Sequence, residues 1–310
     1  MYGRFYSILV VLLWLAMMTW LVTQKMLPSL LRGNPPNYER ILAAKQKESD
    51  VGWRIHVNGK TVGWAVNGVD TMPDTMRILR SWVHFDRLPL NEITPGWLSS
   101  VARLANLGSI EMTLDCESKI YIDPLGRLSL WEATVHLDEF KNAVRAIGRF
   151  EENTMKVTVR VAGASYETEL EVNRDALIND ALAPETQLPG LREDQSWAVE
   201  LCNPLQSPQA PVEVIQARVE RREPLDWQGR LRDCWVVVYR DMPGTASGVS
   251  GGVRGRLWVL EDGTVIKQQA DVFGGDVVFN RLPRREAERL VKEATRLAKE
   301  SELVELPSND

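Results

Sequence analysis

Apolar and polar residues alternate with a period of two through most of this chain, and no other feature constrains the fold as strongly. In the first such run, 53–57, tryptophan, isoleucine and valine alternate with arginine and histidine. Asn58-Gly59 then supplies a two-residue turn into 61–65, which is the pattern of a β-hairpin. Successive side chains of a strand point to opposite faces, so each run predicts a strand with one apolar and one polar face.

The alternation recurs along the chain, with turn sequences between some of the runs. Asp123-Pro124-Leu125-Gly126 and Asp262-Gly263 each precede a new run. Hairpins that follow one another predict an antiparallel sheet, packed on its apolar side and solvated on its polar side. The further runs cover 112–122, 128–137, 155–161, 166–172, 214–221, 234–240, 253–260 and 264–272.

Three helical segments are expected to cover the apolar side of this sheet. Thr94-Pro95 combines a capping residue with proline at the first helical position, and predicts a helix near 95–107. A second helix is predicted over 139–147, with Gly148 as its stop. The third is an amphipathic helix over 284–303, with alanine, leucine and valine in one stripe. A sheet with helices on one face is an α+β fold of two layers.

The N-terminal segment 5–24 contains no charged residue and is almost wholly apolar. About twenty helical residues rise roughly 30 Å, which matches the hydrocarbon core of a bilayer. A transmembrane helix is therefore predicted there, followed over 25–50 by a linker and a short helix. A cleaved signal peptide is the alternative, but no pair of small residues after Ala16 offers a cleavage site. The predicted anchor residues are Ile8, Leu9, Val10, Val11, Leu12, Leu13, Trp14, Leu15 and Trp20.

Composition bounds the partners of the chain and its redox chemistry. A net charge of −5 argues against nucleic acid, which requires a basic patch to neutralise phosphates. Three cysteines, Cys116, Cys202 and Cys234, do not make a disulfide framework. A Cys202–Cys234 bridge would need an oxidising compartment and close Cα atoms, and the sequence leaves that pairing open.

Catalytic motifs are weak. Gly248-Val249-Ser250-Gly251-Gly252 fits the pattern of a serine hydrolase elbow, but a strand-like run follows Ser250 where that chemistry needs a helix, and no histidine follows His136. The three histidines, His56, His84 and His136, have no metal-ligand spacing and are interpreted as solvated strand residues. We therefore expect no enzyme, no catalytic residue, no metal site and no cofactor.

Several short motifs together carry a family resemblance over about half the chain. They are Gly59-Lys60-Thr61-Val62-Gly63, Leu188-Pro189-Gly190-Leu191, Gln195-Ser196-Trp197, Asn203-Pro204, Leu257-Trp258-Val259-Leu260-Glu261-Asp262-Gly263-Thr264-Val265 and Arg281-Leu282-Pro283. Through them the chain resembles a bacterial group of domains of unknown function whose fold is like that of the periplasmic lipoprotein carriers. The resemblance implies a curved antiparallel half-barrel with an apolar concave surface, and it assigns no ligand and no catalytic residue. Those carriers are normally soluble or lipid-tethered, so a transmembrane tether departs from their pattern.

Two arguments about membrane sidedness disagree. Basic residues after 5–24 outnumber those before it, which by the positive-inside rule favours a cytoplasmic domain. Long domains can translocate despite such charges, and the resemblance implies an envelope-facing domain. We expect the main domain to be extracytoplasmic, in the periplasm.

The fold expected overall is α+β: a large curved antiparallel sheet over 51–283, with a few helices on one face, preceded by one transmembrane helix. The function expected is a non-enzymatic, membrane-anchored domain that binds a lipid or another apolar ligand in the half-barrel. A structural subunit of an envelope complex without a small-molecule ligand is the alternative, and a serine hydrolase is the third. The residues proposed to line the apolar site are Trp53, Trp131, Val157 and Val159.

Overall fold

A computed structural model describes most of the chain. The described residues are 13–14, 17–18, 38–45, 50–73, 76–88, 112–137, 140–151, 154–161, 164–171, 183–202, 212–241, 252–272 and 275–305. The elements used below are α3 (Tyr38–Lys45), β1 (Val51–Val57), β2 (Lys60–Thr71), β3 (Arg77–Leu88), β4 (Met112–Ile122), β5 (Leu128–Leu137), β6 (Phe140–Glu151), β7 (Thr154–Val161), β8 (Ala164–Glu171), β9 (Ser196–Cys202), β10 (Val212–Trp227), β11 (Arg230–Asp241), β12 (Val253–Val259), β13 (Val265–Val272), β14 (Gly275–Arg281) and α5 (Arg284–Glu305).

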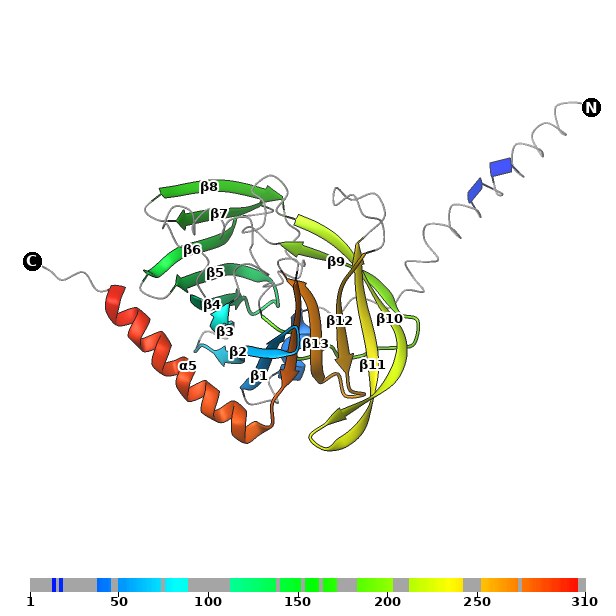
Figure 1. Cartoon of the computed structure of the whole chain (residues 1–310). Coiled ribbons are helices and arrows are strands. Elements are labelled where there is room, and N and C mark those ends of the chain that lie inside the picture. The colour runs from blue at the N-terminus through cyan, green and yellow to red at the C-terminus, as the bar shows by residue number, and fades with distance from the viewer. Residues whose placement is uncertain are drawn as a thin grey trace, which may run out of the picture.

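All the strands belong to one antiparallel sheet, as the alternation predicts. The order in this 14-stranded sheet is β8-β7-β6-β5-β4-β3-β2-β1-β14-β13-β12-β11-β10-β9. Two meanders therefore extend in opposite directions from the pair made by the first and last strands, β1 and β14. The sheet curls (Figure 1), but its two edges, β8 and β9, do not pair, so it is not closed into a barrel.

One face of the sheet, here called the inner face, carries a continuous apolar cluster that extends through both meanders. Trp53 and Phe279 lie in it at the junction of β1 and β14, with Trp131 and Val157 in one meander and Trp197 in the other. Alternate residues of neighbouring strands share a face, so the period of two in the sequence builds this layer directly. The apolar face that the sequence predicts is confirmed.

Helix α5 packs on the opposite, outer face, and not on the apolar side where a helix was expected. A separate cluster there contains Trp64, Val66 and Trp82 of the sheet and Ala294 of the helix. A Cβ added to Gly52 would lie 2.8 Å from the Cα of Ala287, so a glycine on β1 allows this close approach. In the sequence, the packing of a helix on this face corresponds to the run 62–66. All five residues are buried, because the sheet core covers one side of the strand and α5 covers the other.

The predicted turns form. Asn58 and Gly59 both have positive φ, 49° and 76°, which is the conformation of a type I′ hairpin. Asp123 accepts hydrogen bonds through Oδ1 from the backbone N–H groups of Leu125 and Arg127, and so closes the second turn. Asp262 likewise accepts from the N–H of Thr264. Gln228-Gly229, with φ of 56° and 72°, is a similar turn that the sequence analysis missed.

The helix predicted over 139–147 is wrong, because residues 140–147 belong to strand β6. Val144, Ala146 and Gly148 are buried and alternate with less buried neighbours, which is the period of a strand. Phe140, Ala143, Val144 and Ile147 also fit a helical stripe over so short a segment, and pairing with β5 and β7 decides between the two. Strands β3, β9 and β14 were not predicted either.

The predicted C-terminal helix over 284–303 is confirmed, since α5 extends from Arg284 to Glu305. The helix predicted near 95–107 lies outside the described residues. Of the predicted anchor residues, Leu13 and Trp14 are described; both are helical and exposed, and the others lie outside the described part. No described helix is both long and apolar enough to cross a membrane.

Candidate functional site

The four residues predicted to line an apolar site all lie on the inner face and belong to its apolar cluster. Their exposed fractions are 0% for Trp53, 4% for Trp131, and 1% each for Val157 and Val159. Trp131 and Val157 flank Gly148 of β6 in one cross-strand row, and Val159 lies opposite Ala146 of the same strand. Trp53 is on β1, four positions from β5 in the strand order, and belongs to the same apolar cluster.

Gly148 explains why Trp131 and Val157 come together. A Cβ at this position would lie 2.9 Å from Sδ of Met155 and 3.4 Å from Cε3 of Trp131. The missing side chain leaves the room that the indole ring and the thioether occupy. The glycine predicted to end a helix is therefore the packing centre of the proposed apolar site.

Two of the predicted residues carry a polar atom into the apolar layer. The indole N–H groups of Trp53 and Trp131 are buried and have no hydrogen-bond partner among the described residues. A buried donor without an acceptor costs about 1–3 kcal/mol. The guanidinium of Arg281 lies 5.9 Å from the centroid of the Trp53 ring and interacts with its face, but not with its N–H. A ligand that brought an oxygen acceptor to either indole would recover this cost.

The described segment 183–195 adds polar groups at the other end of the inner face. Gln268 on β13 accepts a hydrogen bond from the N–H of Glu185 at 2.9 Å, and Arg281 donates to the carbonyl of Thr186 at 3.1 Å. Burial raises the pKa of the Glu185 carboxyl, and the charge of Lys45 on α3 opposes that shift. Sequence reasoning missed Glu185, because it lies in an irregular segment without any periodic signal.

Tyr239 on β11 is the titratable neighbour of Glu185. Burial raises the pKa of the Tyr239 hydroxyl, and the negative charge of Glu185 raises it further. The tyrosine hydroxyl therefore stays protonated at neutral pH and can donate a hydrogen bond. Next to an apolar layer, a carboxyl and a hydroxyl are suited to hold the polar end of an amphipathic molecule.

A second polar cluster lies on the outer face, beside α5. Asp115 accepts hydrogen bonds through Oδ1 from the indole N–H of Trp82 at 3.1 Å and from Nδ1 of His84 at 2.7 Å. Nε2 of His84 lies 3.1 Å from Asp86 Oδ1, and the imidazole stacks on Trp64 with the centroids 5.1 Å apart. Both ring nitrogens are engaged by carboxylates, so this histidine has a structural role in the described state and no free nitrogen for acid–base catalysis.

The interpretation of His136 as a solvated residue is wrong. Its exposed fraction is 3%, and its ring stacks on Trp82 with centroids 6.1 Å apart. The backbone N–H of Asn142 donates to its Nδ1 at 3.1 Å. His136 is on the polar side of β5, as its period predicts, but aromatic neighbours bury that side of the sheet.

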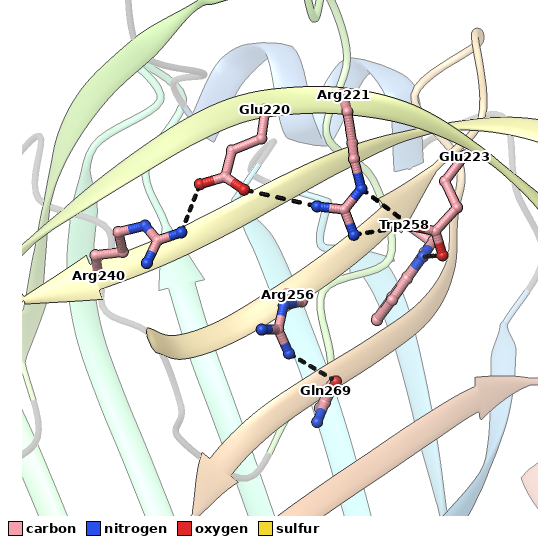
Figure 2. Close-up of polar contacts among 7 residues, drawn as sticks. All are labelled: Glu220, Arg221, Glu223, Arg240, Arg256, Trp258 and Gln269. Atoms are coloured by element: carbon pink, nitrogen blue, oxygen red, sulfur yellow. Dashed lines mark hydrogen bonds and ion pairs between the residues drawn. The ribbon is translucent and has the colours of Figure 1, made fainter. Parts of the chain in front are cut away.

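Charged side chains cover the outer face of β10–β13 in the second meander, and Figure 2 shows how they interlock. Glu220 accepts from Arg240 at 2.7 Å and lies 3.7 Å from Arg221. Glu223 accepts from Arg221 at 2.9 Å and from the indole N–H of Trp258 at 3.2 Å. The hydrogen bond from Trp258 is the main cause that lowers the pKa of the Glu223 carboxyl, and Arg221 adds to it.

The same network continues across the next two strands and covers a small apolar cluster. Arg256 donates to Gln269 at 3.3 Å (Figure 2), and the Lys267 ammonium lies 4.5 Å from the Trp258 ring centroid. Charged side chains with long aliphatic stems can shield apolar groups from water in this way. We interpret this surface as a structural cover. The residues beneath it are Cys234, Val236, Val238, Trp258 and Ile266.

The remaining predicted motifs contribute no site within the described part of the chain. Ser250 lies outside it, and β12 begins at Val253 as a strand, which agrees with the predicted run. No group of three histidine, cysteine or acidic residues in the described part could hold a metal.

The Cys202–Cys234 bridge left open by the sequence does not form, because Cys234 is a buried free thiol. Cys202 pairs with Val212 of β10, whereas Cys234 pairs with Glu223 of the same strand. These positions are separated by roughly 35 Å of strand, far beyond the reach of a disulfide.

Comparisons with known proteins give no family for this chain. No family model and no curated protein matches it. A β-barrel-like protein of the domain of unknown function DUF1849 from Brucella abortus has a TM-score of 0.46 at 8% identity, with 75% of this chain and 94% of that chain covered. A DUF1089 family protein from Pseudomonas aeruginosa has a TM-score of 0.33 at 12% identity, with 65% and 87% covered. The resemblance to the lipoprotein-carrier fold is not confirmed by these comparisons.

Proposed function

We propose that this protein is a non-enzymatic binding domain, which holds a lipid or another apolar molecule against the inner face of its curled sheet. The observation that carries the proposal is the pair of buried indole N–H groups, Trp53 and Trp131, without an acceptor among the described residues. Such donors in an apolar layer offer the few polar contacts that orient a ligand in a mostly apolar site. The ligand is expected to combine an apolar chain with an oxygen acceptor.

We further propose that the segment 5–24 anchors the domain in a membrane and that the domain lies outside the cytoplasm. This proposal rests on the uncharged apolar length of the segment. A reporter fused after Asp310 that is active only in the periplasm should be active in cells, and a reporter active only in the cytoplasm should be silent. The opposite pattern would contradict the proposed sidedness.

A specific observation favours a second candidate function, a subunit of an envelope assembly with a fully packed core. The four proposed lining residues are almost inaccessible, with exposed fractions between 0% and 4%. A ligand therefore requires space that opens between the inner face and what covers it, whereas an assembly subunit requires none.

Two matched variants separate these candidates. Val157→Phe adds volume on the inner face, and Thr158→Phe adds it on the outer side of the same strand. If the inner face opens for a ligand, Val157→Phe should remain nearly as stable as the wild type but lose uptake of a fluorescent fatty acid by the delipidated full chain in detergent. Thr158→Phe should retain uptake.

If the inner face is a packed core, Val157→Phe should instead lose about 1–3 kcal/mol of unfolding free energy, the usual cost of overpacking. Native mass spectrometry of the full chain, released from its membrane in detergent, supplies the direct measurement. A wild-type protein that carries no lipid and takes up none would refute the binding proposal and leave the assembly subunit.

A further inference from the structure

The two edges of the sheet are the only strand edges in the described fold, because every other described strand pairs on both sides. Strand β8 pairs along its whole length with β7, from Val161↔Ala164 to Thr154↔Glu171, without a register shift. An edge strand presents a row of backbone N–H and C=O groups that can pair with another chain. The β8 edge is thus a regular eight-residue template.

Folded proteins usually protect such an edge, and β8 lacks most of the devices they use. Short length, proline, a bulge or an inward-pointing charge would each prevent pairing. None of these is present in β8: the inward positions are Tyr166 and Thr168, opposite Val159 and Val157 of the inner apolar layer. Tyr166 is 40% exposed, so a large ring next to the edge lies open to solvent.

The outward side of β8 carries a row of exposed acidic residues, Glu167 and Glu169. On β7, the residues opposite them include one cation, Lys156, which lies 4.0 Å from Glu169 and also pairs with Glu151. Glu167 has no cation directly opposite it, because its partner on β7 is Thr158. Like charges directly opposite each other across two strands destabilise the pair, so this row excludes another acidic strand and favours a basic one.

The second edge strand is β9. Its inward residues Trp197 and Val199 are buried in the inner apolar cluster, and Ala198 lies exposed on its outward side. Pairing between β8 edges of two copies would place glutamates against glutamates, and β9 of a second copy contains no Lys or Arg to face them. A second copy of this chain is therefore a poor occupant.

We propose that the β8 edge binds an extended segment of a protein partner by strand addition, and that the outward residues of this segment are Lys or Arg in alternation with apolar residues. The apolar residues would extend the inner layer beside Tyr166, and the basic residues would face Glu167 and Glu169. This interaction is independent of the proposed apolar ligand.

The test uses the full chain in a neutral detergent and a fluorescein-labelled peptide in which Lys and Val alternate. Anisotropy should show saturable binding, and a Glu–Val peptide should bind at least tenfold more weakly. The double variant Glu167→Lys/Glu169→Lys should raise the Kd of the Lys–Val peptide at least tenfold. The control Glu193→Lys/Glu293→Lys makes the same change in net charge at exposed positions away from the edge and should leave the Kd within twofold.

Two further measurements distinguish strand addition from simple charge attraction. Methylation of alternate backbone nitrogens of the peptide should abolish binding, because it removes the donors that pair with the edge. Tyr166→Glu adds negative charge but points it toward the apolar layer, so it should weaken binding at least fivefold. Equal binding of the methylated peptide, tighter binding by Tyr166→Glu, or equal losses in both double variants would overturn the proposal. Circular dichroism of each variant verifies that it is folded.

Discussion

The hydrogen-bonded histidine on the outer face should make the stability of this protein fall as pH rises through neutrality. His84 is engaged by Asp115 at 2.7 Å and Asp86 at 3.1 Å, and its ring lies on Trp64 beneath α5. Burial alone would lower the pKa of His84, but the hydrogen bonds and charges of the two carboxylates outweigh it, and the pKa is raised above its ordinary value. The protonated imidazolium is therefore favoured by folding.

The direction of the pH effect follows from this raised pKa. The unfolded chain releases the proton near pH 6.5, whereas the folded chain retains it to higher pH. The stabilisation is complete below about pH 6.5 and is lost as pH rises through the folded-state pKa. A hydrogen bond to a charged group contributes about 1.5–3 kcal/mol. Because His84 is partly exposed, we expect the lower half of that range.

The assay is urea unfolding of the full chain in detergent at pH 5.5, 6.5, 7.5 and 8.5. Wild type should lose roughly 1.5–2 kcal/mol between the lowest and highest pH relative to His84→Gln, which keeps a donor but does not titrate. His56→Gln is the matched control: burial, with the nearby Arg54, lowers the pKa of His56, so that residue contributes stability that falls as pH falls. Parallel pH curves for wild type and His84→Gln would refute this account of the cluster.

Two other predictions concern packing and thiol chemistry. Gly52→Val should cost about 1–3 kcal/mol and increase hydrogen exchange in α5, because its side chain would displace Ala287 from the sheet; Thr61→Val, an exposed change on β2, should leave both unchanged. The Cys234 thiol, buried and with its pKa raised to about 11 mainly by burial, should remain unmodified by a disulfide reagent at pH 8 until urea unfolds the protein. Mass spectrometry that finds Cys234 labelled in the folded state would contradict its burial.

The sequence by itself determined most of the strands, most of their turns and the apolar face. A period of two needs no knowledge of neighbours, because backbone geometry sends alternate side chains to opposite sides. Asn58-Gly59 and Asp262-Gly263 were recognisable for the same local reason, since their backbone preferences do not depend on the rest of the fold. The membrane anchor and the enzyme question stay predictions.

Only the tertiary structure decided which segments pair with one another in the sheet. The segment 140–151 fits both a helical stripe and a strand, and its partners β5 and β7 select the strand. The pairing of β1 with β14 joins segments more than two hundred residues apart, which no local pattern specifies.

The chemistry of the site depends on the same long-range contacts. The alternating pattern places His136 on the polar side of β5, which predicts a solvated residue. In the structure Trp82 stacks on its ring, and His136 is buried. Glu185 acquires its raised pKa from burial in an irregular segment. Whether a side chain is buried depends on which distant residues pack over it. The sequence therefore predicted residues of the inner face, but it could not predict which polar groups would be buried.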